Sequence, residues 1–173
     1  MSLTFRPAQP GEHAALETLI IDAFEPITWF RKLDETHGPL NGCDWRTRWR
    51  HRLASVFTSQ IILVGETSEG IAAVATGTYD PRSTLAYIDL LAVDRRYQGR
   101  GYGRAMLRAF VDHLRGLGAR YCNLECLTDN TAGNELYRSE GWTIATSMHR
   151  WFVDLDQLSG SPSPDPAQSP EPE

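Results

Sequence analysis

The sequence predicts an α/β domain in which a mixed, mostly antiparallel sheet is flanked by helices. Two observations predict this class. Apolar and polar residues alternate in several short segments, which is typical of strands, and recur every three to four residues in longer segments, which is typical of helices. These patterns follow one another in the order β, α, α, β, β, β, α, β, α, β, which favours a sheet with helices on its faces.

The first part of the chain predicts one strand and two helices. Residues 3–7 alternate as a short strand, and a helix starts at Pro10. Residues 25–44 contain two prolines and two glycines, so we expect this stretch to be irregular. Asp44 is a good N-cap residue for a second helix that reaches Phe57. The apolar face of that helix is expected to comprise Trp45, Trp49, Leu53 and Val56.

The central part predicts three strands and a long helix. Residues 60–66 and 71–79 have strand character and are separated by a short turn, which indicates a hairpin. Residues 84–93 form the next predicted strand. Residues 103–118 then repeat apolar side chains at helical spacing, so a helix is expected directly after a short loop.

The last part predicts a strand over residues 120–127, a short helix over 130–140 and a final strand over 142–154. Gly141 is suited to end the short helix in a left-handed conformation. The last 15 residues, 159–173, hold five of the ten prolines and four serines. Such a segment buries too little apolar surface to order itself, so we expect one domain over 1–158 and a disordered tail.

The bulk composition narrows the class of protein. The chain has 173 residues, of which 41% are hydrophobic, and no apolar run approaches the length of a membrane span. No signal-peptide pattern occurs at the N-terminus, so we expect a cytoplasmic protein without a membrane partner. The net charge of −5 argues against a nucleic-acid partner. The three cysteines have no metal-ligand spacing, so no metal site is expected.

A glycine-rich loop is the strongest candidate for a binding site. It follows the strand that ends at Val93 and precedes the helix that begins near Gly103. Glycine lets the backbone approach a ligand closely, and a helix N-terminus offers unpaired N–H groups with partial positive charge. Together they predict an anion site suited to phosphate groups. The loop comprises Gln98, Gly99, Arg100, Gly101, Tyr102, Gly103 and Arg104.

Two common phosphate-binding motifs do not match this loop. The dinucleotide motif requires glycines at relative positions one, three and six, and the sixth position counted from Gly99 is Arg104. The P-loop requires Gly-Lys followed by Ser or Thr, which this loop lacks. By itself, the loop is also compatible with a plain turn whose arginines face solvent.

The residues around the loop resemble the GNAT superfamily of N-acetyltransferases. The loop matches the family signature Arg/Gln-x-x-Gly-x-Gly/Ala through Gln98, Gly101 and Gly103. Before it stands Leu91-Ala92-Val93-Asp94, and after it come Asn130, Asn134, Tyr137 and Gly141-Trp142. The resemblance covers residues 3–154 and is strongest over 89–142. It implies that the strands at 84–93 and 120–127 splay apart and that acetyl-CoA binds between them.

The resemblance also implies roles for single residues. Backbone groups of Leu91, Ala92 and Val93 would bind the acetyl and pantetheine part of acetyl-CoA, and the backbone N–H groups of residues 98–104 would hold its pyrophosphate. Asn130 and Asn134 match positions near the cofactor. Tyr137 matches the tyrosine that protonates the leaving thiolate, and its spacing from Asn134 places both side chains on one helix face.

The base that deprotonates the amine has two candidates. Asp89 lies in an otherwise apolar strand, where a carboxylate is costly without a partner, so it is either a working group or a satisfied structural one. In a regular strand it would share a face with Tyr87 and Leu91. Glu125 is the second candidate, and a water chain is an alternative to both.

The acceptor is expected to bind near residues 25–44 and the helix that follows. Phe24, Trp29, Phe30 and His37 are the candidate acceptor-binding residues, suited to an apolar or aromatic acceptor. The alternative is that the aromatic residues cover the core and that His37 faces solvent.

The expected function is direct transfer of an acetyl group from acetyl-CoA to a primary amine, carried by a small molecule or a peptide. The alternatives are a non-catalytic module that binds a CoA thioester, and O-acylation or acyl-CoA decarboxylation on the same scaffold. The expected oligomeric state is a monomer or a homodimer.

Overall fold

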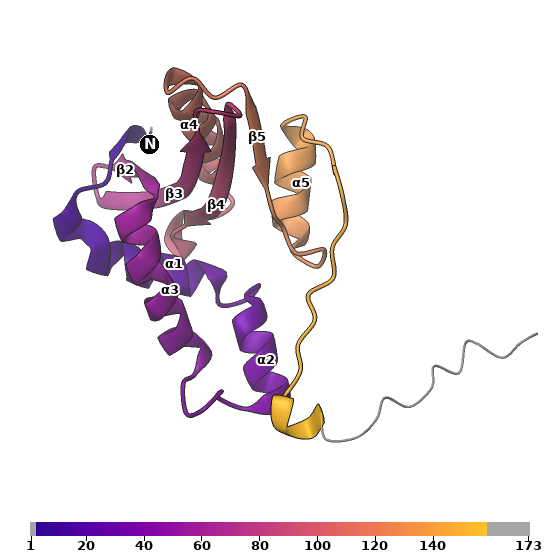
Figure 1. Ribbon diagram of the computed structural model, residues 1–173. Helices are drawn as coiled ribbons and strands as arrows, with labels where there is room; N and C mark the ends of the chain where they lie inside the picture. The colour runs from indigo at the N-terminus through magenta and orange to yellow at the C-terminus, as the bar shows by residue number, and fades with distance from the viewer. Residues whose placement is uncertain (1–2, 159–173) are drawn as a thin grey trace, which may run out of the picture. The chain divides into compact units, whose positions relative to one another are not determined.

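The computed structural model describes residues 3–158, which divide into one unit that ends at Trp142 and a second that begins at Thr143 (Figure 1). The expected disordered tail, residues 159–173, lies outside the described residues. The first unit contains the sheet and all of the α-helices of the described chain. None of the helices in residues 3–158 is long and apolar enough to cross a membrane.

The sheet has five strands in the order β1-β2-β3-β4-β5. The strands span Thr4–Pro7, Ile61–Thr67, Gly70–Asp80, Leu85–Val93 and Tyr121–Leu124. The first four pair with their neighbours in antiparallel fashion, and β5 pairs with β4 in parallel. The predicted mixed, mostly antiparallel sheet is therefore confirmed.

Helices cover both faces of this sheet (Figure 1). The 3₁₀ turn η1 (Pro10–Glu12) leads into α1 (His13–Phe24), which packs with α3 (Trp45–Ser59) on one face against Val64, Val74 and Leu90. On the other face α4 (Tyr102–Gly116) packs against Ala73, Ala75 and Ile88, and residues of α5 (Thr131–Ser139) pack against the same core. We call these the α3 face and the α4 face of the sheet.

Local capping explains where two of these helices begin. The Asp44 carboxylate accepts a hydrogen bond of 2.8 Å from the Thr47 N–H, which confirms the predicted N-cap of α3. The Asn130 side chain accepts one of 3.1 Å from the Gly133 N–H at the start of α5. Trp45, Trp49, Leu53 and Val56 are buried, as the apolar pattern of α3 predicted.

The prediction of an irregular stretch over residues 25–44 was wrong, because it contains α2 (Trp29–His37). Thr28 caps this helix by accepting a hydrogen bond of 3.3 Å from the Phe30 N–H. Gly38, at φ +74°, follows its last residue. Pro26, Gly38 and Pro39 flank the helix rather than interrupt it, so they mark its ends and not the absence of regular structure.

The predicted final strand over residues 142–154 is also absent. In the second unit residues 143–154 form neither strand nor helix, and a 3₁₀ turn, η3 (Leu155–Leu158), follows. Apolar side chains of this segment stay exposed, with Trp151 at 90% and Ile144 at 69%. A strand exists through pairing with a neighbour, and apolar character alone does not supply one.

A bulge interrupts β4 at Asp89. Thr76 of β3 pairs with Leu90, and the next residue, Gly77, pairs with Ile88, so Asp89 has no partner of its own. Asp89 and Leu90 consequently lie on the same face, the α3 face, where they meet Arg52 and the core around α1 and α3. Leu91 packs on the α4 face. The expectation that Asp89 shares a face with Leu91 was therefore wrong, because it assumed a regular strand.

Candidate functional site

The strands β4 and β5 form a fork. Their parallel pairing runs from Leu85 opposite Tyr121 to Ile88 opposite Leu124 and then stops. The strand β4 continues to Val93, paired only with β3. The part of β4 beyond Ile88 thus has a free edge, and the bulge at Asp89 lies at the point where the two strands separate.

The free edge of β4 presents backbone groups of Leu91 and Val93. The N–H of Asp94 donates to Ala72 of β3 at 2.9 Å. Because alternate residues of a strand point to opposite edges, Leu91 and Val93 direct their N–H and C=O groups away from β3. The Val93 carbonyl accepts a hydrogen bond of 3.1 Å from the Gln98 side chain, which agrees with this direction. These groups are placed to bind an extended, amide-containing chain in the fork.

The loop after β4 is built to accept an anion. After a 3₁₀ turn at Arg95–Tyr97, Gly99 and Gly101 adopt φ of +74° and +80°, and a Cβ built at either position meets no atom within 4 Å. Gly101 is the N-cap of α4, and its carbonyl accepts the first intrahelical hydrogen bond, from the Ala105 N–H at 3.1 Å. The N–H groups of residues 103–104, in the first turn of α4, therefore have no intrahelical partner. This cradle fits a pyrophosphate.

The arginines near the loop have different partners. Arg95 pairs with Glu25 at 2.8 Å and Arg96 with Asp94 at 2.7 Å. Arg104 pairs with Glu140 at 2.8 Å and so links α4 to the end of α5. The guanidinium of Arg100 lies 5.5 Å from the centre of the Tyr97 ring and, among residues 3–158, is in no ion pair. Arg100 is the cation of this loop that remains available to a phosphate.

The segment that connects β5 to α5 is held by two asparagines. Besides the cap made by Asn130, the Asn134 amide donates hydrogen bonds of 2.8 Å to the carbonyls of Leu127 and Asn130. Both side chains thus fix the second arm of the fork through contacts within the protein. The structure accounts for them as positioning residues, and their contact with a cofactor stays a prediction.

Tyr137 lies in α5, three residues beyond Asn134, and is half-buried. Its ring centre is 6.1 Å from that of Trp142, and it packs against the core of the α4 face. Burial, with a smaller contribution from Cys126, raises the pKa of the Tyr137 hydroxyl to about 12. The hydroxyl therefore keeps its proton at neutral pH, as a proton donor must.

Asp89 is enclosed by one partner from α3 and by the residue that caps the C-terminus of α3. Its carboxylate forms an ion pair with Arg52 of α3 and accepts a hydrogen bond of 2.9 Å from the Gln60 amide. The Asp89 side chain is 8% exposed. Within residues 3–158, the buried Gln60 Oε1 and Thr76 Oγ1 have no hydrogen-bond partner. Asp89 is thus a satisfied carboxylate that holds the bulge against α3.

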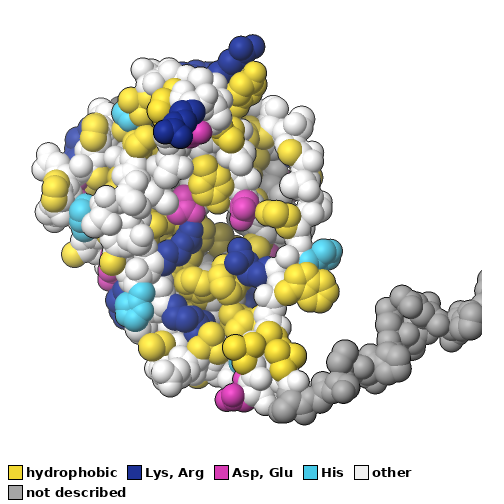
Figure 2. All heavy atoms as spheres, in the orientation of Figure 1, with side chains coloured by type: hydrophobic (Ala, Val, Ile, Leu, Met, Phe, Trp, Pro, Cys, Tyr) yellow, Lys and Arg dark blue, Asp and Glu magenta, His cyan; other side chains and the backbone are white. Residues whose placement is uncertain are grey.

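Glu125 has the opposite environment. It directly follows β5, so Asp89 and Glu125 each stand one residue beyond the last cross-strand pair, Ile88 and Leu124. Glu125 is exposed, and no ion pair ties it to another of the described residues. Figure 2 shows a hollow near the point where β4 and β5 separate, with Asp or Glu side chains on both sides.

The predicted acceptor residues fall into two groups. Phe24 and Phe30 pack on Trp49, with ring centres 5.1 and 5.7 Å apart, and Trp29 packs on Phe30 at 4.4 Å. These three residues form one aromatic cluster around Trp49. His37 is exposed at the end of α2, outside this cluster.

A partly buried ion pair fixes α2 to α3. Arg48 contacts Asp34 at 2.6 Å, and their side chains are 16% and 12% exposed. The Asp34 carboxylate also accepts the Trp45 N–H at 2.6 Å, and Arg48 donates to the Phe30 carbonyl at 2.8 Å. The aromatic cluster therefore sits on a fixed support.

A forked sheet followed by a glycine cradle at a helix N-terminus is the arrangement that the resemblance to acyltransferases implied. Residues 24–142 match the protein family described as the acetyltransferase (GNAT) family. The chain belongs to this family, and the resemblance noted from the sequence is confirmed.

Several known proteins are similar to this chain. It is 43% identical over 65 residues to the N-alpha-acetyltransferase RimI of Mycobacterium tuberculosis. These 65 residues make up 38% of this chain and 39% of that protein. It is 36% identical over 66 residues to the [ribosomal protein bS18]-alanine N-acetyltransferase of Escherichia coli. These 66 residues make up 38% of this chain and 45% of that protein. The matched region thus spans less than half of either relative.

Solved structures agree on the fold. The crystal structure of the Escherichia coli ribosomal-protein-S18-alanine N-acetyltransferase matches with a TM-score of 0.65 at 20% identity, over 89% of this chain and 86% of that one. The PaiA N-acetyltransferase of Thermoplasma acidophilum, in complex with coenzyme A, matches with a TM-score of 0.65 at 12% identity, over 86% and 94%.

Arg52 and Gln60 were missed by the sequence reasoning. Both contact Asp89 across 37 and 29 residues of chain. The signal that could have found them is the carboxylate itself, because a buried Asp in an apolar strand requires a cation or an amide donor nearby.

Proposed function

We propose that this protein transfers an acetyl group from acetyl-CoA to a primary amine by direct attack, without a covalent enzyme intermediate. One observation carries the proposal: the free edge of β4 leads directly into a glycine cradle at the start of α4. This combination supplies hydrogen bonds for an extended chain and, next to them, N–H groups for a pyrophosphate. A CoA thioester has both parts in that order.

Residues of the loop and the start of α4 would bind one part of the CoA thioester, and residues of β4 the other part. The N–H groups of residues 103–104 and the Arg100 guanidinium hold the pyrophosphate, and Leu91 and Val93 hold the amide-containing arm. When bound, acetyl-CoA supplies the activated acetyl group. The N–H of Leu91 lies two residues beyond the bulge, at the free edge, and serves as the donor toward the thioester oxygen.

Three proton transfers accompany the reaction. The acceptor arrives as an ammonium ion and must lose a proton before its nitrogen can attack. We assign this step to Glu125, directly or through a water, because Asp89 is already engaged by Arg52 and Gln60. The new C–N bond forms as the C–S bond breaks, and the Tyr137 hydroxyl gives its proton to the leaving sulfur. The proton that the acylated nitrogen still carries then passes to the Tyr137 oxygen, directly or through water, and restores the hydroxyl.

The acceptor we propose is the N-terminal amine of a polypeptide. The relatives named above carry protein-directed names, an N-alpha-acetyltransferase and a ribosomal protein alanine N-acetyltransferase. Glu125, an exposed carboxylate in no ion pair with another described residue, stands at the fork where the ammonium would arrive, which favours a cation over an anion.

Thermal shift and thiol release test this proposal. Acetyl-CoA is expected to raise the Tm, because a ligand that binds only the folded state stabilises it. Release of free CoA thiol is expected with a peptide that begins with alanine, and mass spectrometry should place one acetyl group on its N-terminus. A Tm shift without thiol release across a broad amine panel would instead identify a non-catalytic module that binds CoA thioesters.

A further inference from the structure

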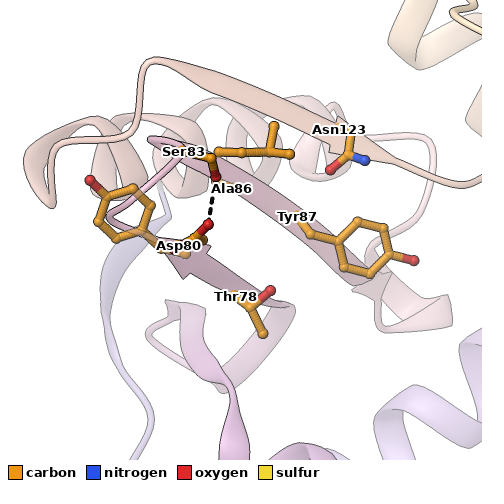
Figure 3. Close-up of a pocket in the computed structure, with 8 residues that line it drawn as sticks. Thr78, Asp80, Ser83, Ala86, Tyr87 and Asn123 are labelled. Carbon is orange, nitrogen blue, oxygen red and sulfur yellow. Dashed lines mark hydrogen bonds between the residues drawn. The ribbon is translucent and has the colours of Figure 1, made fainter.

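A cavity of about 360 Å³ opens beside the fork, at the end of the sheet where β4 begins. Figure 3 shows residues that line it, among them Thr78 and Asp80 of β3, Tyr87 of β4 and Asn123 of β5. Its size lies within the range of sites that bind small molecules or parts of a chain. None of the roles assigned above uses it.

The cavity lies on the same face of the sheet as Asp89. Ala86, Ile88 and Leu124 pack on the α4 face, so the residues that alternate with them, Tyr87 and Asn123, point to the α3 face. Tyr87 and Asn123 are also direct cross-strand partners, one step before the last pair of the fork. The cavity therefore begins where the acceptor nitrogen must stand and extends away from it.

The lining has the chemistry of a site for a peptide backbone. It offers hydroxyls from Thr78, Ser83 and Tyr87 and an amide from Asn123, which can both donate and accept hydrogen bonds. Thr78 and Asn123 are exposed. Among the described residues that line the cavity there is no Lys or Arg.

One carboxylate lies at the far end. The Ser83 hydroxyl donates to Asp80 at 2.7 Å and the Arg82 N–H at 3.0 Å, and these bonds lower the pKa of Asp80. Asp80 is therefore ionised at neutral pH. It is the partner of Leu85, the first residue of β4.

The length of the strand that borders the cavity favours an extended peptide as its occupant. From Ile88 back to Leu85 the strand advances by about 10 Å at its usual rise per residue, which an extended peptide of about three residues would match. We propose that this cavity binds the second to fourth residues of a polypeptide acceptor whose N-terminal amine lies at the fork, with preference for a basic side chain near Asp80. This inference rests on the proposed function for the identity of the acceptor.

The expected consequence is selection by length and charge. A pentapeptide that begins with alanine should bind better than alanine amide, which cannot reach Thr78 or Asp80. Among pentapeptides, Lys at the fourth position should be preferred over Asp, because Asp80 attracts the first and repels the second.

Isothermal titration of the CoA-loaded protein with these acceptors tests the site, and thiol release is measured in parallel. Asn123→Ala should raise the Kd of the pentapeptide about 10-fold, as expected for the loss of one or two hydrogen bonds, and leave alanine amide unchanged. Asp80→Asn should reduce the preference for Lys over Asp. Asp112→Asn, on the exposed side of α4, is the matched control and should change neither.

The outcomes separate this inference from the proposed function. Peptide binding that is sensitive to Asn123 and occurs without thiol release would support the site and contradict the transferase activity. Thiol release with equal efficiency for alanine amide and the pentapeptides would overturn the site and leave the activity standing. Equal loss for both acceptors in Asn123→Ala would also overturn it, because such a loss indicates damage at the fork.

Discussion

The two arms of the fork differ in how they are supported. The arm formed by β4 is paired with β3 along its length, carries the bulge and ends in the glycine cradle. Its carboxylate, Asp89, is buried between Arg52 and Gln60. The arm formed by β5 is four residues long and is followed by the exposed Glu125. The first arm therefore offers fixed backbone groups, and the second offers side chains that are less constrained.

This difference suggests that the β4 arm binds the CoA thioester and that the β5 arm supplies the base. A CoA thioester presents the same chemical groups in every turnover, so preformed backbone donors suit it. A base must change its protonation state during each turnover, which an engaged ion pair opposes and an exposed carboxylate permits. A carboxylate stands one step beyond the fork on each arm, and it is thus expected to act structurally at Asp89 and chemically at Glu125.

Replacing the carboxylate of the second arm is expected to give the largest effect. Glu125→Gln should lower kcat about 100-fold, the usual contribution of a general base, without changing the Tm. The deficit should shrink at high pH, where the acceptor amine is already neutral. Initial rates of thiol release between pH 6 and 10 measure this. An unchanged rate at pH 7 would assign the proton transfer to water or to Asp89.

The corresponding change in the first arm should act on stability. Asp89→Asn leaves Arg52 and the bulge without their anion, and we expect a loss of about 2 kcal/mol in the free energy of unfolding, less than for a fully buried pair because Arg52 is partly exposed. Urea titration measures it, with Asp112→Asn as the control at an exposed pair. Normal stability combined with a severe loss of kcat would reverse the assigned roles of the two arms.

The glycine cradle should respond to a single added methyl group. Gly101 has φ +80°, so Gly101→Ala is strained, although its Cβ would meet no neighbouring atom. We expect the free loop of the variant to relax from this φ, so that CoA binding must restore it and the Kd for CoA rises about 10-fold, in line with the roughly 1–2 kcal/mol cost of a left-handed non-glycine residue. Gly11→Ala also adds a methyl group in open space, but Gly11 has no such φ, and this variant should bind CoA normally.

The smallest expected effect lies at Thr76, beneath the bulge. Its buried hydroxyl has no partner among residues 3–158. Thr76→Val removes this polar group at nearly constant shape and should raise the free energy of unfolding by about 1 kcal/mol. Calorimetry of the wild-type protein and the Thr76→Val variant shows whether the substitution raises or lowers the stability. A lower Tm for the Val variant would show that the hydroxyl is hydrogen-bonded to water and contributes to the support of Asp89.

Most of the fold could be predicted from the sequence, because apolar periodicity and caps act locally. The strands β1 to β5 and the helices α1, α3, α4 and α5 follow from such patterns. The helix α2 was hidden because its polar, charged sequence lies between prolines and glycines. The predicted strand after Trp142 failed for another reason, since strand formation depends on a partner that no local pattern specifies.

The bulge could not be predicted for a physical reason. Ala86, Ile88, Leu90 and Ala92 are all buried, which keeps a regular alternation of burial straight through Asp89. Helices cover both faces of β4, so a change of face exchanges one apolar environment for another and leaves no mark on the polarity pattern. The partners of Asp89 lie on α3 and at its C-cap, and only the tertiary structure brings them to β4.

The bulge also bears on how the chain tolerates insertions and deletions. Because Ile88 and Leu90 pair with consecutive residues of β3, Asp89 is the one residue of β4 that could be removed without turning any other side chain to the opposite face. A deletion at this position should therefore preserve the hydrophobic core. It would also remove the local twist that a bulge introduces, and with it the divergence of β4 from β5. One additional residue in β4 is thus expected to distinguish a sheet in which β4 and β5 stay paired from one in which they separate and leave a binding cleft.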